Sequence, residues 1–184
     1  PVPVFNIADL ATPYAGIFKE IVLNVTWRQL QAAEGGPLDT SFIDSAIQQV
    51  NQFNDTYHTD LGIKLRVWGG FTAPIWVKEI NGAPITVTGQ NAVDPGSYAS
   101  QTIGRFWTAD YINAWQNLQN ALATKYDGMA IIRGISQTAG AYATDEPFVP
   151  LKTNAAVSSN PADGTVNQIA QLQMGGFNDA GEML

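Results

Sequence analysis

The chain has 184 residues, which is enough for one domain with a sizeable hydrophobic core. Hydrophobic residues make up 45% of the sequence and charged residues 14%, proportions that favour a folded domain over a disordered chain. A net charge of −7 with only nine lysines and arginines argues against nucleic acid and anionic membranes as partners, because basic side chains supply most of the affinity for both.

The residues that are missing also restrict the chemistry. Cysteine is absent, which excludes disulfides, Cys-ligated zinc and thiol nucleophiles, and His58 is the single histidine. We therefore expect no metal and no organic cofactor. No apolar run reaches the roughly 18 residues that a membrane-spanning helix needs. The composition fits an exported bacterial-type protein, the preferred interpretation, and also a cytoplasmic one, so the compartment stays open.

The first part of the chain alternates between strand and helix patterns. Residues 1–7 form a short strand candidate that prolines interrupt, and residues 21–27 form a stronger one rich in β-branched side chains. A helix is predicted to begin at Ser41, which fits a capping box with Asp44. Its apolar residues recur on one face at helical spacing: Ile43, Ala46, Ile47 and Val50. A strand over 63–70 follows and ends in two glycines.

The middle of the chain contains one long irregular stretch and one long helix. Residues 71–106 are predicted to form a loop with a short helix at about 75–78, and loops of this length are usually functional. The long helix begins at Thr108 or Asp110, runs to about Tyr126, and repeats apolar residues on one face: Tyr111, Trp115, Leu118 and Leu122.

A strand over 129–136 comes next, and the remaining residues are less regular. We predict a loop over 151–164 and a helix over 165–174. A further helix beginning at Asn178 or Asp179 is expected to be cut short by the end of the chain. This βα alternation predicts an α/β fold with a parallel sheet. Three or four βα units would form the N-terminal half of a (β/α)8 TIM barrel, all of residues 1–184 as one domain. A second chain, or a second copy of this one, is then expected to complete it.

Five segments in order resemble the clan A glycoside hydrolases, the beta-galactosidase-like, family 42-type (β/α)8 barrels. Residues 25–39 are similar to their "W..L.p.eG..d" motif, and Phe42-Ile43-Asp44 continues it. The strand over 64–70 leads to a "P.W" segment at 74–76. Residues 107–127 resemble the helix before strand four, and residues 144–148 correspond to the acid/base segment.

The resemblance implies a retaining glycoside hydrolase in which Glu146 is the acid/base. Such enzymes use two carboxyl groups about 5 Å apart. The family's nucleophile would lie beyond Leu184, so the fragment alone is expected to be inactive. Asp145 stands where the family usually has asparagine, and we interpret it as a hydrogen-bonding neighbour or a loop cap. The plainer interpretation of Glu146 is a solvated carboxylate that opens a loop.

Aromatic side chains near strand ends suit sugar binding, because C–H faces of sugar rings pack on aromatic faces. Trp76 and Trp107, which flank the long loop, are the preferred platforms, with loop anchoring as the alternative. Trp27 and Trp68 lie at strand ends and fit either the core or a cleft. Arg66 either points into the barrel, where it pairs with a carboxylate, or outward at the boundary between helices and sheet.

The expected ligand is thus a carbohydrate. The first hypothesis is the glycoside hydrolase just described, completed by the missing half. The alternative is a non-catalytic carbohydrate-binding or structural protein on the same scaffold. A flavodoxin-like nucleotide binder is disfavoured because no strand leads into a glycine-rich phosphate loop.

Overall fold

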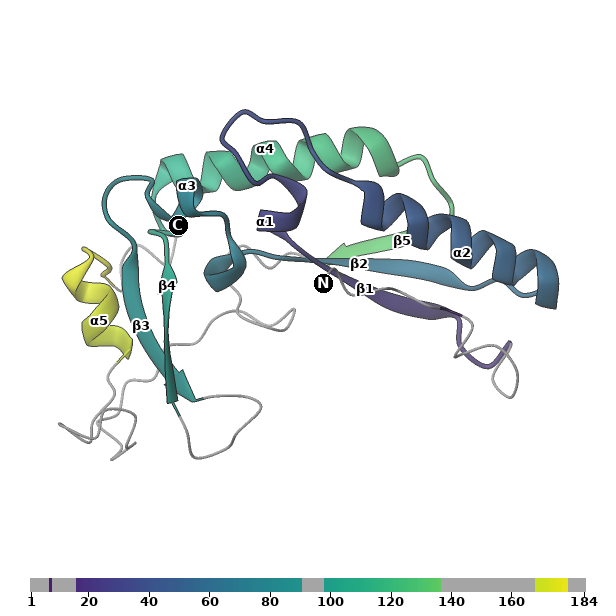
Figure 1. The fold of residues 1–184 in the computed structure, drawn as a ribbon, viewed down its shortest axis with the longest axis horizontal. Helices are drawn as coiled ribbons and strands as arrows, with labels where there is room; N and C mark the ends of the chain where they lie inside the picture. Colours follow the sequence, from purple (N-terminus) through teal and green to yellow (C-terminus); the bar gives the residue numbers. More distant parts are fainter. Residues whose placement is uncertain (1–6, 8–15, 91–97, 137–167, 179–184) are drawn as a thin grey trace.

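The computed structural model describes residues 7, 16–90, 98–136 and 168–178 (Figure 1). Within these ranges the molecule is elongated. A parallel sheet with one long helix occupies one end, and an antiparallel hairpin with a short helix occupies the other. A second long helix extends from the hairpin end over the sheet. No helix in the described ranges is long and apolar enough to span a bilayer.

The parallel sheet contains β1 (Glu20–Thr26), β2 (Gly62–Trp68) and β5 (Ile132–Ser136), in the order β1-β2-β5. β2 is the central strand and pairs in parallel with both neighbours. The predicted mixed α/β fold with a parallel sheet is therefore confirmed for the described residues. The strand predicted at the N-terminus lies outside them, apart from Ile7.

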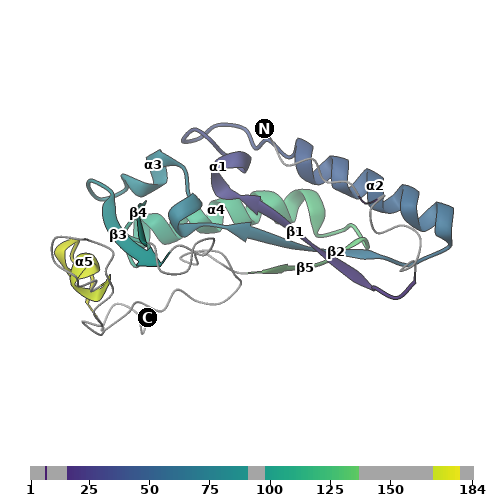
Figure 2. The same ribbon diagram turned by 60° about the horizontal axis from the view of Figure 1, so that its bottom comes forward.

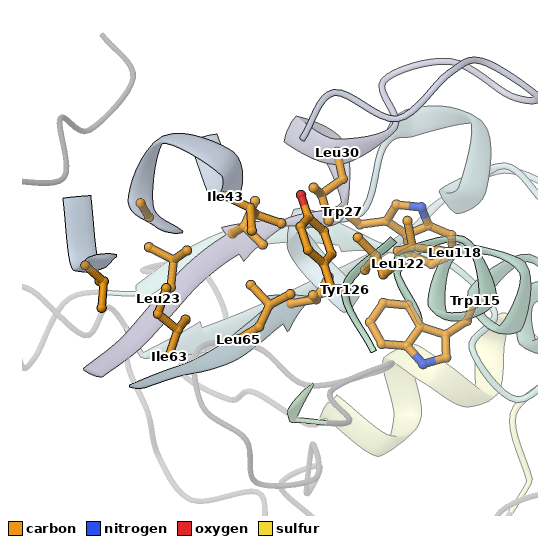
Figure 3. Packing of buried hydrophobic residues seen from close by; sticks show 14 of the residues in the cluster. Leu23, Trp27, Leu30, Ile43, Ile63, Leu65, Trp115, Leu118, Leu122 and Tyr126 are labelled. Atoms are coloured by element: carbon orange, nitrogen blue, oxygen red, sulfur yellow. The ribbon is translucent and has the colours of Figure 1, made fainter. Parts of the chain in front are cut away.

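Both long helices lie on the same face of this sheet. α2 (Ser41–Tyr57) and α4 (Ala109–Tyr126) occupy the segments that connect one parallel strand to the next. Their buried residues join those of β1 and β2 in one hydrophobic cluster (Figure 3). The strand residues in this cluster alternate along the chain: Leu23, Val25, Ile63, Leu65 and Val67. Burying each such side chain contributes roughly 1.5–3 kcal/mol, so the cluster is the main source of stability.

The residues of α2 and α4 that face the sheet are largely those that the apolar spacing predicted. Of the predicted residues of α2, Ile43, Ala46 and Val50 are fully buried and Ile47 is partly buried. The four predicted residues of α4 are all buried: Tyr111, Trp115, Leu118 and Leu122. Near the end of α4, Lys125 Nζ lies 2.6 Å from Asp44 Oδ2, and Tyr126 donates a hydrogen bond of 2.7 Å to Asp44 Oδ1. Burial by itself would raise the pKa of Asp44, but the hydrogen bonds from Lys125, Tyr126 and Thr40 hold it below its usual value.

Two helix starts differ from the prediction. The capping box expected at Ser41 is absent; instead the Asp39 carboxylate accepts hydrogen bonds from the backbone and hydroxyl of Ser41, which lowers the pKa of Asp39. A capping box does occur at Thr26, which the sequence analysis did not identify. Thr26 and Gln29 cap a one-turn helix, α1 (Trp27–Leu30), so Trp27 belongs to this helix and no longer to the strand.

The long loop predicted over 71–106 is wrong in part. It contains the predicted short helix, α3 (Ile75–Lys78), preceded by a 3-10 turn over Gly70–Thr72. It also contains an unpredicted antiparallel hairpin, formed by β3 (Ile85–Gln90) and β4 (Tyr98–Ile103). The alternation of apolar and threonine residues in β3 is a strand signal, but it is only four residues long.

A second, smaller hydrophobic cluster holds the hairpin to the end of the described chain. α5 (Gln168–Met174) lies beside β3 in both views of the molecule (Figures 1 and 2). The buried residues of this cluster come from both parts of the chain: Phe71, Ile85, Val87, Ile103, Leu172 and Phe177. Arg105 Nε donates a 3.0 Å hydrogen bond to the carbonyl of Gly175 and strengthens this contact.

Candidate functional site

The three parallel strands end at one edge of the sheet. Thr26, Trp68 and Ser136 are the last residues of β1, β2 and β5. Ligands of parallel α/β sheets bind outside this carboxyl edge, where the strand-to-helix loops meet. This carboxyl edge is therefore the first candidate for a ligand-binding site.

Polar side chains lie close to this edge on the face of the sheet that no described helix covers, which we call the helix-free face. Asn24 of β1 is the register partner of Arg66 of β2, and Arg66 is the partner of Ser136 of β5. Partners in a parallel pair point to the same face. Because the neighbouring residues Leu65 and Val67 face the helices, these three residues point away from them. Arg66 thus has the orientation that the barrel-interior alternative requires. It is half-buried, Asn24 is exposed and Ser136 is buried.

Trp68 ends β2 on the same face as Arg66 and is half-buried. Its indole Nε1 is shielded from solvent, and no acceptor among the described residues accepts its hydrogen. Buried donors of this kind are uncommon in folded proteins. Among the described aromatic residues, Trp68 is the one that ends a strand of the parallel sheet at the carboxyl edge.

Trp27 lies on the other side of the sheet, in the core. Its side chain has no exposed surface. It makes edge-to-face contacts with three aromatic rings, at centroid distances of 5.9 Å to Trp76, 5.7 Å to Tyr111 and 5.2 Å to Trp115. An indole enclosed in this way cannot stack on a sugar, so we assign Trp27 to packing.

Trp76 is half-buried and lines an open cleft of about 610 Å³. The cleft lies where the loop after α1, the helix α3 and the first turns of α4 meet. Trp76 Nε1 donates a 3.2 Å hydrogen bond to the carbonyl of Gln31, which fixes the ring. The surrounding polar side chains are Gln31, Glu34, Asp110, Asn113 and Asn117. Asp110, Asn113 and Asn117 form a polar row along α4 at spacing i, i+3 and i+7. This row was not predicted, because the prediction for this helix rested on its apolar face.

Trp107 belongs to the smaller cluster. Its ring contacts Phe106 and Phe177, each at a centroid distance of 5.1 Å. The five predicted residues Trp27, Trp68, Trp76, Trp107 and Arg66 therefore divide among the core, the carboxyl edge, the α4 cleft and the hairpin. Only Arg66 and Trp68 share one face. Asp145 and Glu146 lie outside the described residues.

Lys78 is an ionisable residue that the sequence analysis did not single out. Only 4% of its surface is exposed. Its Nζ donates hydrogen bonds of 2.6 Å to the carbonyl of Phe71 and 3.3 Å to the hydroxyl of Thr102. Burial, with a smaller effect from the nearby charge of Arg28, lowers the pKa of Lys78 to about 8. A lysine at the end of a four-residue helix gives no sequence signal of burial.

Within the described ranges, no group of three or more carboxylate or imidazole side chains is placed to bind a metal ion. The arrangement offers hydrogen-bonding and aromatic groups at two places, the carboxyl edge and the α4 cleft. Both present hydrogen-bonding groups to a polar ligand.

The fold and these two surfaces define a mixed α/β protein whose parallel sheet has polar groups on its helix-free face. The chain matches no known family model, no curated protein and no solved structure.

Proposed function

We propose that the chain is a glycoside hydrolase-type protein whose parallel sheet belongs to a (β/α)8 barrel, with Glu146 as the acid/base. The observation that carries this proposal is the polar row of Asn24, Arg66 and Ser136 on the helix-free face, next to the carboxyl edge. Glu146 follows Ser136, the last residue of β5, by ten residues in the sequence.

The placement of the helices is the one that a (β/α)8 barrel requires, and one half of a doubly wound sheet shares it. In a barrel all helices cover the outer face and the inner face is lined by side chains, whereas doubly wound sheets have helices on both faces. Here α2 and α4 share one hydrophobic cluster on one face of the described sheet.

In the proposed reaction, Glu146 protonates the oxygen of the leaving sugar while a second carboxylate attacks the anomeric carbon. Glu146 then removes a proton from the water that releases the product. Arg66 is proposed to orient one of the two carboxylates, since a guanidinium binds a carboxylate through two parallel hydrogen bonds. Trp68 is proposed to contact the sugar at the edge.

Substituting Glu146→Gln tests this proposal. The longest product of the coding sequence is assayed on aryl glycosides with poor and with good leaving groups. General acid catalysis contributes about 10²–10⁴-fold, and it matters most when the leaving group is a strong base. We expect kcat/KM, which reports the step that expels the leaving group, to fall by this factor for poor leaving groups and far less for good ones.

Glu20→Gln is the matched control, because Glu20 is an exposed glutamate at the opposite, amino end of β1. A wild-type rate for Glu146→Gln on poor leaving groups would remove Glu146 from the mechanism. A loss of equal size in kcat/KM for good and poor leaving groups would show that Glu146 does not donate the proton.

The α4 cleft favours a second candidate function, a carbohydrate-binding protein without hydrolysis. Its aromatic and amide groups suit sugar recognition and need no pair of catalytic carboxylates. Product analysis separates the two functions. Glycan binding without any reducing-end release over long incubation would favour the binding protein.

A further inference from the structure

The geometry points to a second carbohydrate site, separate from the carboxyl edge, in which the α4 cleft binds a neutral oligosaccharide against Trp76. The cleft is on the helix-covered side of the sheet, whereas Arg66 and Trp68 point to the other side. This inference rests on the second candidate function and names the class of sugar that its cleft would bind, and it needs no catalytic residue.

Trp76 has the properties of a rigid platform. Its Nε1 is already bonded to the carbonyl of Gln31, and one ring edge meets Trp27 at a centroid distance of 5.9 Å and an angle of 86°. The ring is therefore held from two directions while it remains half-exposed in the cleft. A platform that is fixed before binding loses little conformational entropy when a sugar packs on it.

The loop that forms one wall is also held in place. The side chain of Gln31 accepts a hydrogen bond from Trp27 Nε1 at 3.3 Å and donates one to the carbonyl of Gly36 at 3.4 Å. The backbone of Asp39 bonds to Leu30 at 2.8 Å and closes the loop. Glu34 lies inside this closed loop and lines the cleft.

The α4 wall supplies hydrogen-bonding groups that the fold leaves available. Asp110, Asn113 and Asn117 are exposed, and their side chains make no hydrogen bond to another residue in the described ranges. Their spacing places them in one row along the helix. Amides donate and accept, and carboxylates accept, so the row complements the hydroxyl groups of a sugar chain.

Charge narrows the ligand class. The cleft contains the carboxylates of Glu34 and Asp110, and no lysine or arginine lines it. Acidic sugars would meet like charges without a compensating cation. The structure therefore favours neutral sugars, and it disfavours uronic acid polymers and sulfated glycans.

Binding is tested with the 184-residue chain by calorimetric titration against galacto-, xylo- and cello-hexaose, with hexagalacturonate as the acidic counterpart. We expect at least one neutral hexaose to bind and hexagalacturonate to bind at least tenfold more weakly. Asn117→Ala is expected to lower the affinity for the neutral hexaose by about tenfold, and Trp76→Ala is expected to lower it further. Asn117 is exposed, so its substitution does not threaten the fold.

Asn120→Ala is the matched control for Asn117→Ala, because Asn120 is an exposed asparagine of α4 that does not line the cleft. Unchanged affinity in both Trp76→Ala and Asn117→Ala would overturn the inference, as would tighter binding of hexagalacturonate or no binding of any neutral hexaose. The titration requires no hydrolysis. Failure of the Glu146→Gln assay therefore leaves this site standing, and failure of the titration leaves the assignment of Glu146 untouched.

Discussion

The molecule has two regions that are built in different ways. The sheet region consists of β1, β2, β5, α2 and α4, which are long elements with regular apolar spacing. The hairpin region consists of β3, β4 and α5, and its buried residues come from segments separated by more than sixty positions in the sequence. The first region can form its core from consecutive βα units, whereas the second needs a distant helix. The secondary structure of the sheet region can therefore be predicted from the regular spacing of its apolar residues, and that of the hairpin region cannot.

The two regions meet at a short junction. Lys78 of α3 bonds to Phe71 and to Thr102 of β4, and the backbone at Gly104 passes close to Lys78 and Tyr111. Both proposed carbohydrate surfaces lie on the sheet region or at its border with this junction. Substitutions in each region and at the junction test whether the two regions unfold independently.

The largest expected effect comes from a matched pair of leucines, both with no exposed surface. Leu65→Ala removes the centre of the sheet-region core and should lower the free energy of unfolding by about 2–5 kcal/mol in urea denaturation. Leu172→Ala acts in the hairpin region, and we expect it to reduce hydrogen-exchange protection of β3, β4 and α5 while the parallel strands stay protected. Equal loss of protection in both regions would show that they unfold as one unit.

Lys78→Met tests the junction through pH. The pKa of Lys78 is about 8 when folded and 10.5 ordinarily, so between these values the unfolded chain binds the extra proton and wild-type stability rises with pH. This rise is on the order of 2–3 kcal/mol and should be missing in the variant. Burial raises the pKa of Tyr111 and Tyr126, which lowers stability above pH 10, but both proteins share that term. Parallel curves of unfolding free energy against pH would contradict the prediction.

Gly104→Ala adds a methyl group where the regions touch. Its Cβ would lie 2.9 Å from the Tyr111 ring, 3.0 Å from the Lys78 Cα and 3.1 Å from the Val77 carbonyl. Because two of these atoms are backbone, we expect a destabilisation of about 1–3 kcal/mol by thermal unfolding. Gly128→Ala is the control, since nothing lies within 4 Å of its added Cβ. Similar melting temperatures for the two variants would mean that the backbone at the junction shifts to accommodate the added methyl group at little cost in stability.

The smallest effect on stability is expected at the capping box of Thr26 and Gln29, in the sheet region. Thr26→Ala removes the hydroxyl that caps α1 and should destabilise the protein by about 1 kcal/mol. Thr26→Ser keeps the hydroxyl and should retain most of the stability. A comparison of chemical denaturation midpoints checks this order, and equal midpoints for the two variants would show that the cap contributes nothing.

The candidate site was only partly predictable. Arg66 was foreseen as a residue that either faces the barrel interior or lies outward, and alternation along a strand cannot choose between the faces of a sheet. The packing of α2 and α4 against Leu65 and Val67 made that choice. The tryptophans show the same limit. Trp27, Trp68, Trp76 and Trp107 have similar local sequence signals, yet the structure places them in four different environments.

The sequence by itself determined the elements of the sheet region, because the spacing of apolar residues is a local property that selects helix or strand directly. Tertiary structure alone decided the hairpin region, the burial of Lys78 and the separation of the tryptophans into core, edge and cleft. The physical reason is that burial depends on which distant residues cover a side chain. Leu172 closes the hairpin core over Ile85 and Val87, and no pattern within residues 85–103 reveals that it will do so.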